Sequence, residues 1–246
     1  MESYIQFTNQ SQGRDRILRA TQYACALARY MLRNDPSRKD ILMKLQSLQS
    51  SMSSGRKLFR LGNTVNSVDA AKRTLLLSDP ILRFCLTVSN LSRALYFICD
   101  NVLWARSLGL VRDINKERWS LNATRYYFVS LVMNLTRDVY LMAQLMVQRS
   151  RDRQYKHKVH QHLNESTDVA CVVVPQLDAF VFLLIECLKG NPAVALDTVK
   201  NVCDLFIPLD RLGVYQTSEG VVGFCGLLSS LLGILSVLKP HLKIKP

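Results

Sequence analysis

Four polar side chains lie in an otherwise apolar stretch of the chain, at steps of four, three and four residues. They are Ser89, Arg93, Tyr96 and Asp100. Residues at these steps share one side of a helix, so the four groups form a stripe with hydroxyls, one cation and one anion. Charged groups in an apolar helix face a partner helix or water rather than lipid. We therefore predict an intramembrane polar stripe that packs a second helix or lines a path for small metabolites.

A second pattern combines apolar and basic side chains within residues 56–77. The apolar residues recur at helical steps and are predicted to insert into a membrane: Leu58, Leu61, Val65, Val68 and Leu75. The basic residues beside them are predicted to bind lipid headgroups: Arg56, Lys57, Arg60, Lys72 and Arg73. A helix of this kind lies in the membrane interface, where each Lys or Arg attracts anionic lipid by about 1 kcal/mol. The alternative is a domain helix with a solvated basic face.

Signatures of catalysis and of metal binding are missing from the sequence. It contains no nucleophile elbow, phosphate-binding loop or HExxH motif. His157, His160 and His162 lie in a strongly polar stretch without a recognised metal-binding motif, so we interpret them as part of a solvated segment. The basic residues are spread over the whole chain, without a nucleic-acid-binding motif. We expect no enzyme activity, no cofactor, no metal ion and no nucleic-acid partner.

Two apolar segments have the length of a membrane-spanning helix. Residues 220–238 carry no charge, and as a helix they extend about 28 Å, close to the ~30 Å hydrocarbon core of a bilayer. A buried helix of a soluble protein is the alternative. The other helix is predicted at 80–107, capped by Asp79 and opened by Pro80. Its apolar part favours insertion by about 4 kcal/mol, against about 2.5 to 3.5 kcal/mol for central Arg93, so it inserts only marginally without a partner.

The 220–238 segment also contains small residues spaced so that another helix can approach closely. They are Gly223, Gly226, Ser229, Ser230 and Gly233. We interpret them as a helix-packing surface, and a homodimer contact is one candidate for its use.

Helical periodicity dominates the rest of the chain and strand alternation is nearly absent. The predicted fold class is therefore all-α: a multi-pass helical membrane protein with amphipathic N-terminal helices. Further helices are predicted at 14–33, 39–48, 116–149, 175–189 and 193–206. The predicted regions are a cytosolic N-terminal helical region (1–79), a first membrane helix (80–107), an intervening helical region (108–219) with a polar loop (149–168), a second membrane helix (220–239) and a short basic cytosolic tail (240–246).

Composition agrees with a basic protein at a membrane in a reducing compartment. The chain has 32 Lys+Arg and 19 Asp+Glu, a net charge of +13 that suits anionic headgroups. Its seven cysteines have no CxxC spacing and are interpreted as small, reduced hydrophobic residues. The polar N-terminus lacks a signal-peptide core. With two crossings, both termini are expected in the cytosol, and Lys239, Lys243 and Lys245 mark the tail as cytosolic.

Three motifs carry a resemblance to a known family. They are Leu61-Gly62-Asn63, RALYFICDNVLW at 93–104 and DLFIPLD at 204–210. With GVVGFCGLLSS at 220–230, they make the chain similar to the peroxin-eleven family of peroxisomal membrane proteins over nearly its whole length. The opening FTNQSQGRDR and the total length most resemble the vertebrate alpha form.

The resemblance implies a multi-pass protein of the peroxisomal membrane, with both termini cytosolic, that promotes peroxisome elongation, proliferation and fission. In this family an N-terminal amphipathic helix inserts into the outer leaflet, and the matching segment is 56–77. The resemblance also implies homo-oligomers, hetero-oligomers with family paralogues, insertion by the peroxisomal membrane-protein import receptor, and coupling to a fission adaptor and a dynamin-like GTPase.

Two functions are therefore open. In the leading one, the apolar residues of 56–77 wedge into one leaflet and favour curvature, with oligomerisation concentrating the wedge. The alternative is a pore or transport protein for small metabolites, motivated by the polar stripe and by Asp178 and Glu186 in the helix predicted at 175–189.

Overall fold

The structure is a computed structural model that describes residues 11–35, 38–111, 113–163, 184–239, 242 and 244, with the side chains of 153–163 left aside. Within these ranges the regular secondary structure is helical and no strand occurs, which confirms the all-α prediction. A short helical segment covers 184–190. The other elements are α2 (Ser11–Leu32), α3 (Lys39–Phe59), α4 (Asn63–Thr74), α5 (Pro80–Ser107), α6 (Lys116–Leu163), α8 (Pro192–Arg211) and α9 (Glu219–Leu238).

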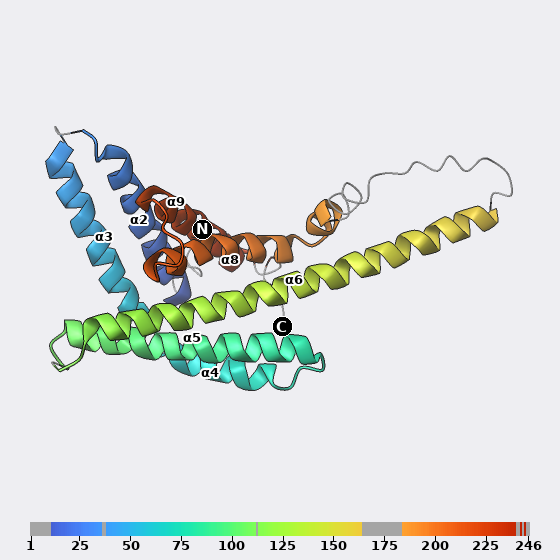
Figure 1. The fold of residues 1–246 in the computed structure, drawn as a ribbon, viewed down its shortest axis with the longest axis horizontal. Helices are drawn as coiled ribbons and strands as arrows, with labels where there is room; N and C mark the ends of the chain where they lie inside the picture. The colour runs from blue at the N-terminus through green and yellow to red at the C-terminus, as the bar shows by residue number, and fades with distance from the viewer. Residues whose placement is uncertain are drawn as a thin grey trace.

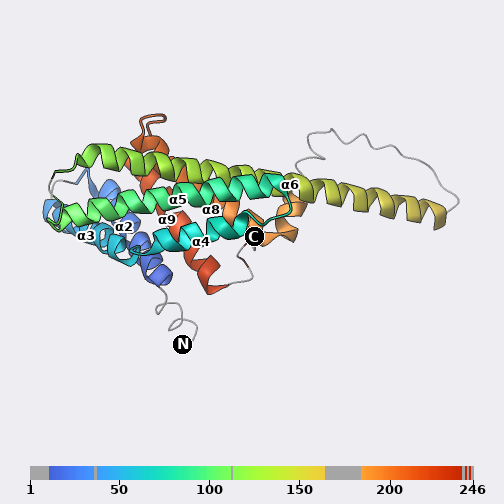
Figure 2. The same ribbon diagram turned by 90° about the horizontal axis from the view of Figure 1, so that it is seen from below.

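The helices form two layers (Figures 1 and 2). In one layer α4 packs on α5 and α5 packs along α6. In the other, α2 packs on both α3 and α9, and α8 packs on α9. Contacts between α6 and α8 join the layers, and α6 extends far beyond both of them.

Two of the described helices, α5 and α9, are long and apolar enough to cross a membrane, and they are the two segments predicted from the sequence. Asp79 caps α5, because its Oδ1 accepts hydrogen bonds from the amides of Ile81 at 2.9 Å and Leu82 at 3.1 Å. Ser218 caps α9 by accepting from the amide of Val221. The two helices lie in different layers and run in clearly different directions (Figures 1 and 2).

The prediction of one continuous helix at 56–77 is wrong. α3 runs to Phe59, the chain turns, and α4 begins at Asn63. The turn contains Gly62 with φ of 82°, a left-handed conformation that glycine adopts without steric penalty. Apolar spacing alone could not show this break, because the three- and four-residue steps continue across the turn although the helix axis does not.

Three other helices are longer than predicted. α3 continues beyond residue 48 through the serine-rich stretch, where it packs along α2. α6 continues as helix to Leu163, so residues 149–163 are not the predicted loop, and the rest of that loop lies outside the described residues. α8 passes through Pro208 to Arg211. Most of the helix predicted at 175–189 also lies outside the described residues.

Candidate membrane surface and polar interior

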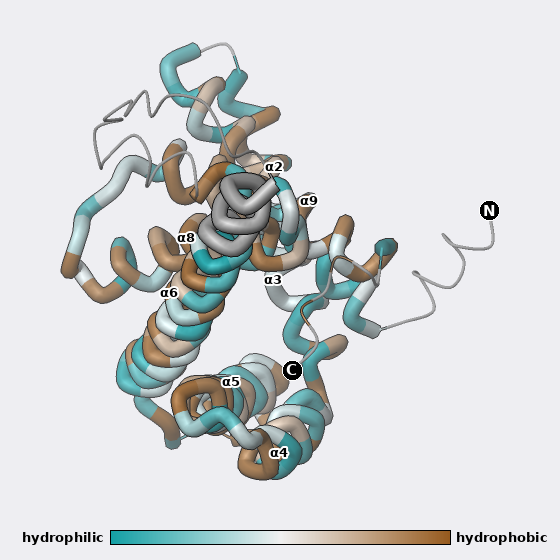
Figure 3. The backbone as a smooth tube through the Cα atoms, turned by 90° about the vertical axis from the view of Figure 1, so that its right-hand side faces the viewer, coloured by the Kyte–Doolittle hydropathy of each residue, from teal (hydrophilic) through white to brown (hydrophobic). Residues whose placement is uncertain are grey.

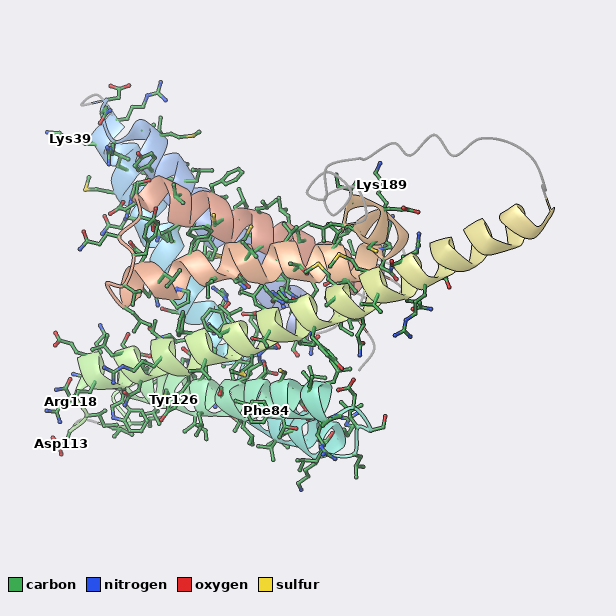
Figure 4. All side chains as sticks on the ribbon, turned by 45° about the vertical axis from the view of Figure 1, so that its right-hand side comes forward. Lys39, Phe84, Asp113, Arg118, Tyr126 and Lys189 are labelled. Atoms are coloured by element: carbon green, nitrogen blue, oxygen red, sulfur yellow. The ribbon has the colours of Figure 1, made fainter. Side chains whose placement is uncertain are left out.

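The outward side of α5 is apolar and its inward side is polar or small. The buried residues are Cys85, Ser89, Ser92, Ala94, Cys99 and Asp100, whereas the exposed apolar ones are Ile81, Phe84, Leu91, Leu95 and Ile98. Phe84, labelled in Figure 4, is 62% exposed. A surface helix in water has the opposite arrangement. Seen end-on, α4 and α5 form an outer edge of the molecule, away from α2 and α9 (Figure 3).

α4 shows the same reversed pattern. Its buried residues Ser67, Ala71 and Thr74 are small or polar, and Thr74 Oγ1 lies 3.0 Å from Thr87 Oγ1 of α5. All five side chains predicted to insert into a membrane are exposed: Leu58, Leu61, Val65, Val68 and Leu75. Leu76, which the sequence analysis missed although it adjoins Leu75, is 88% exposed. We call these six residues together with the exposed apolar residues of α5 the outer apolar surface.

α4 runs antiparallel to α5. Arg60, just before α4, reaches Tyr96 and Asp100 of α5, whereas Thr74 at the end of α4 meets Thr87. The axes of α4 and α5 therefore lie along the same direction, so both helices make the same angle with a membrane that the outer apolar surface contacts.

The basic residues predicted to bind headgroups separate into two groups. Lys72 and Arg73 are exposed on α4, where Arg73 pairs with Asp69 one turn earlier. Lys57 lines an interior cavity together with Arg56 and Arg60. In the structure, therefore, only Lys72 and Arg73 lie beside the exposed apolar residues of α4.

Arg56 and Arg60 are interior ion-pair residues, which corrects the expectation that they face headgroups. Arg56 donates to Asp15 Oδ1 at 3.1 Å and to Gln22 Oε1 at 2.7 Å. Arg60 lies 3.5 Å from the same Asp15 oxygen and 3.2 Å from Asp100 Oδ2. The two arginines therefore link α3 to α2 and α5.

Three of the four residues of the predicted polar stripe of α5 contact partner groups. Ser89 Oγ lies 2.8 Å from Asn134 Oδ1 and 3.1 Å from the carbonyl oxygen of Ser130, both on α6. The hydroxyl of Tyr96 accepts a hydrogen bond from Arg60, which also pairs with Asp100. The fourth member, Arg93, lines the cavity between the layers.

A buried ion pair joins α2, α8 and α9. Arg19 of α2 pairs with Asp204 of α8, which also accepts a hydrogen bond from Ser229 of α9. Burial alone would raise the pKa of Asp204, but the charge of Arg19 and the hydrogen bonds from Ser229 and Arg19 outweigh it, and the pKa lies below its ordinary value. Asp204 therefore stays ionised at neutral pH.

A second buried network joins α6 to α8. Arg137 pairs with Asp197 and donates from Nε to Asp138 Oδ1 at 3.0 Å. Asn201 Nδ2 donates to the other oxygen of Asp138 at 2.8 Å, and Asp138 is completely buried. The polar groups of this network thus satisfy one another across the two helices.

A polar cavity of about 330 Å³ lies between α2, α3, α5, α6 and α8. Eight of its lining side chains are basic and three, Asp15, Asp100 and Asp204, are acidic. The sequence analysis missed this basic interior because its residues come from five separate helices. The one signal was Arg93, a cation within an apolar helix.

The small residues of α9 pack against the same chain. A Cβ on Gly226 would lie 2.5 Å from a ring carbon of Tyr23, and one on Gly223 would lie 3.2 Å from the backbone nitrogen of Leu27, both on α2. Ser229 and Ser230 are completely buried, and Gly233 contacts Arg16. The predicted close packing is present, and the helix packed against these residues is α2 of the same chain.

Several predicted residues fall outside what the structure describes. These are the side chains of His157, His160 and His162 and the tail residues Lys243 and Lys245. Among the described residues, no group of three or more His, Cys, Asp or Glu is arranged to hold a metal ion.

Known proteins match the chain over its whole length. The family model of peroxisomal biogenesis factor 11 (PEX11) matches residues 1–238. The chain is 44% identical to human peroxisomal membrane protein 11A over 245 residues, which cover 100% of the chain and 99% of that relative. It is 42% identical to human peroxisomal membrane protein 11B over 259 residues, covering 100% of both.

A more distant relative is the peroxisomal membrane protein 11 homolog of Dictyostelium discoideum, 24% identical over 95% of the chain and 92% of that protein. No solved structure matches the chain. The resemblance drawn from short motifs, including the likeness to the alpha form, is thus confirmed. The chain belongs to the peroxisomal biogenesis factor 11 (PEX11) family, whose members are peroxisomal membrane proteins that act in peroxisome biogenesis.

Proposed function

We propose that the protein remodels the peroxisomal membrane by inserting its outer apolar surface into the cytosolic leaflet. One observation carries this proposal: α4 exposes Val65 and Val68, and Leu75 just after it is exposed too, while Ser67, Ala71 and Thr74 are buried on the side of α5. Removing a Val or Leu side chain from water stabilises by roughly 1.5–3 kcal/mol. Inserting several of them at the headgroup boundary expands one leaflet relative to the other and favours curvature.

Lys72 and Arg73 complement this insertion, because they are exposed next to the inserting residues. Each basic side chain near an anionic surface adds about 1 kcal/mol of attraction. Their long stems can also extend toward the headgroups while the valines stay below them. The outer apolar surface thus has fewer basic side chains beside it than the sequence pattern predicted. Its apolar area is larger than predicted, since α5 contributes its own exposed residues.

The antiparallel packing of α4 on α5 supports an arrangement in which both helices lie along the leaflet. If α5 stood upright, α4 would stand beside it, with Asp69, Lys72 and Arg73 exposed near the level of Thr87. Charges in the hydrocarbon core cost about 2.5–3.5 kcal/mol each. The arrangement with two crossings, α5 and α9, and both termini in the cytosol is the second proposal; it is supported by helix length and composition and requires α4 to leave α5.

A cysteine in the loop after α5 distinguishes these arrangements. Leu110 is 72% exposed in that loop, and the described native cysteines are buried. With α5 along the leaflet, a Leu110→Cys variant in intact peroxisomes reacts with a membrane-impermeant maleimide added from the cytosolic side. Protection until the membrane is permeabilised would mean that α5 crosses.

Remodelling itself is tested with a pair of neighbouring substitutions in the full-length protein. Val65→Glu places a charge on the inserting side of α4, whereas Asn66→Glu places the same charge at the next, exposed polar position. We expect Val65→Glu to abolish elongation of peroxisomes in cells and tubulation of anionic liposomes by purified protein, and Asn66→Glu to retain both. Equal activity of the two variants would rule out insertion through this side of α4.

A second candidate function is a pore or transport protein for small metabolites, which the polar cavity supports. Arg93, Tyr96 and Asp100 of the predicted stripe line it together with residues of four other helices. Conductance of the purified protein in planar bilayers, with ion selectivity altered by Arg93→Glu, would establish this function. Lack of conductance would leave remodelling alone.

We also propose that the protein forms homo-oligomers and hetero-oligomers with family paralogues, that the peroxisomal membrane-protein import receptor inserts it, and that it works with a fission adaptor and a dynamin-like GTPase. Family membership supports these partners. Since the small residues of α9 pack on α2, self-association needs another surface. Co-purification of two differently tagged copies from peroxisomes tests it; recovery of one tag alone would contradict it.

A further inference from the structure

Three basic side chains approach one another in the cavity from three different helices. Arg16 comes from α2, Arg93 from α5 and Lys200 from α8, and all three line the cavity. Burial lowers the pKa of Lys200; its ion pair with Asp197 acts against this, and the charges of Arg16 and Arg93 lower it further. Burial and the neighbouring charge of Arg19 likewise lower the pKa of Arg16, while the charges of Asp204 and Asp15 act against them. Lys200 thus lies within electrostatic range of both arginines in the wall of one cavity.

The carboxylates of the cavity are already engaged by other arginines. Asp204 pairs with Arg19, and Asp15 and Asp100 pair with Arg60. Within the part of the chain that the structure describes, no ion pair or hydrogen bond is made by the guanidinium of Arg16 or of Arg93. Asp204 and Asp15 attract Arg16 through their charge without bonding to it, and Arg93 is only partly buried. Basic side chains still outnumber carboxylates around the cavity, so the arrangement favours an anion from outside the chain.

We propose that Arg16, Arg93 and Lys200 bind the phosphate group of a small anionic ligand inside this cavity. Arginine presents paired N–H donors that match two phosphate oxygens, and lysine contributes a point charge. The volume of about 330 Å³ is at the lower end of the range for small-molecule sites and suits a compact phosphate-bearing group. The cavity reaches the surface near Arg211, which is exposed and also lines it.

Two sources can supply this phosphate: a water-soluble phosphate compound or the headgroup of an anionic lipid. The inference depends neither on membrane remodelling nor on conduction, since it rests on the three cations alone. It is tested with the purified full-length protein in a nonionic detergent free of phosphate, using pyrophosphate at constant ionic strength as the probe and chloride as the reference.

The informative pair of variants lies on one helix. Arg93→Gln removes a cavity cation, whereas Arg83→Gln removes an exposed cation two to three turns earlier on α5. We expect pyrophosphate to bind the wild type and Arg83→Gln by calorimetry, and to bind Arg93→Gln about tenfold more weakly, as expected for one lost charge-assisted contact. Without ligand, Arg93→Gln should unfold at a temperature no lower than the wild type, because removing the charge relieves repulsion.

A lipid experiment separates the two sources. The protein is reconstituted in nanodiscs of phosphatidylcholine with or without phosphatidic acid, and lipid retained after re-extraction into detergent is measured. Retention of phosphatidic acid by the wild type and Arg83→Gln but not by Arg93→Gln, without pyrophosphate binding, identifies the headgroup as the ligand. If neither probe distinguishes Arg93→Gln from Arg83→Gln, the site does not exist.

Arg93→Lys is the control for the case in which Arg93→Gln loses binding because it folds poorly. It keeps the charge but loses the paired donors, so it should bind several-fold more weakly than the wild type while its circular dichroism is unchanged. Wild-type affinity in Arg93→Lys together with unchanged affinity in Arg93→Gln would overturn the proposal. None of these variants alters Val65, the position that tests membrane remodelling. Loss of phosphate binding can therefore be told apart from loss of remodelling.

Discussion

The outer apolar surface and the interior between the two layers have the reverse of the polarity found in a soluble protein. Leu76, just after α4, is 88% exposed, whereas Asp138 on α6 is completely buried. α5 belongs to both regions, with Phe84 outside and Asp100 inside. Apolar side chains have no reason to avoid a lipid environment, so helices there are held together by close packing and polar contacts. The comparison supports the proposal that lipid covers the outside, and it shows ionic contacts joining the helices on the inside.

The largest effect is expected from breaking the buried ion pair between Arg19 and Asp204. Asp204→Ala leaves the Arg19 charge buried without its partner, which should lower the free energy of unfolding by about 3–5 kcal/mol. Denaturation in detergent, followed by circular dichroism, measures this loss. The double variant Arg19→Met with Asp204→Leu should recover most of it. A loss below about 1 kcal/mol in Asp204→Ala would mean that the interior does not depend on this pair.

Filling the contact between α9 and α2 should have the next largest effect. Gly226→Val forces Tyr23 to move, because a Cβ at this position already lies 2.5 Å from its ring. Overpacking of this kind costs about 1–3 kcal/mol. Val221→Leu, on the exposed side of the same helix, should change the free energy of unfolding by less than about 0.5 kcal/mol. Similar losses in both variants would remove the distinction between the inner and outer sides of α9.

Acid should remove part of the contribution that the ion pair between Arg19 and Asp204 makes to the free energy of unfolding. The folded-state pKa of Asp204 lies below the unfolded value of about 3.9, so its contribution is present above that unfolded value and is lost as the pH falls through the lowered folded-state pKa. The unfolding temperature should therefore fall more steeply below about pH 4 in the wild type than in Asp204→Asn. Parallel pH profiles of the two proteins would contradict this assignment.

The smallest effect on stability is expected at the outer apolar surface. Val65 is 71% exposed, so Val65→Glu should change the free energy of unfolding in detergent by no more than about 0.5 kcal/mol while it abolishes remodelling. Thermal unfolding of the variant beside Asn66→Glu measures this. A large destabilisation by Val65→Glu alone would show that this side chain packs inside the protein.

Local signals in the sequence were enough to predict α5 and the exposure of the residues proposed to insert. Asp79 and Pro80 mark the first turn of α5, and its predicted bounds are those of the structure. The apolar steps correctly identified Val65 and Val68 as residues of one side of a helix, because that periodicity is local.

The rest depended on contacts between distant parts of the chain. A glycine can end a helix or be tolerated within one, so Gly62 did not by itself reveal the turn. Arg56 and Arg60 have the spacing of headgroup-binding residues, but Asp15 and Asp100, far away in sequence, draw them inside. The basic cavity is assembled from five helices, and Arg93 within the apolar α5 is its one local signal.

Lipid contact at Val65 is the most direct test of the reversed polarity. A fluorophore attached to Val65→Cys or to Asn66→Cys in the full-length protein, bound to anionic liposomes, is quenched by lipids brominated near the headgroup end of the acyl chain if it lies in the leaflet. The outer apolar surface predicts strong quenching at position 65 and weak quenching at position 66. Weak quenching at both positions would contradict insertion of α4 into the membrane.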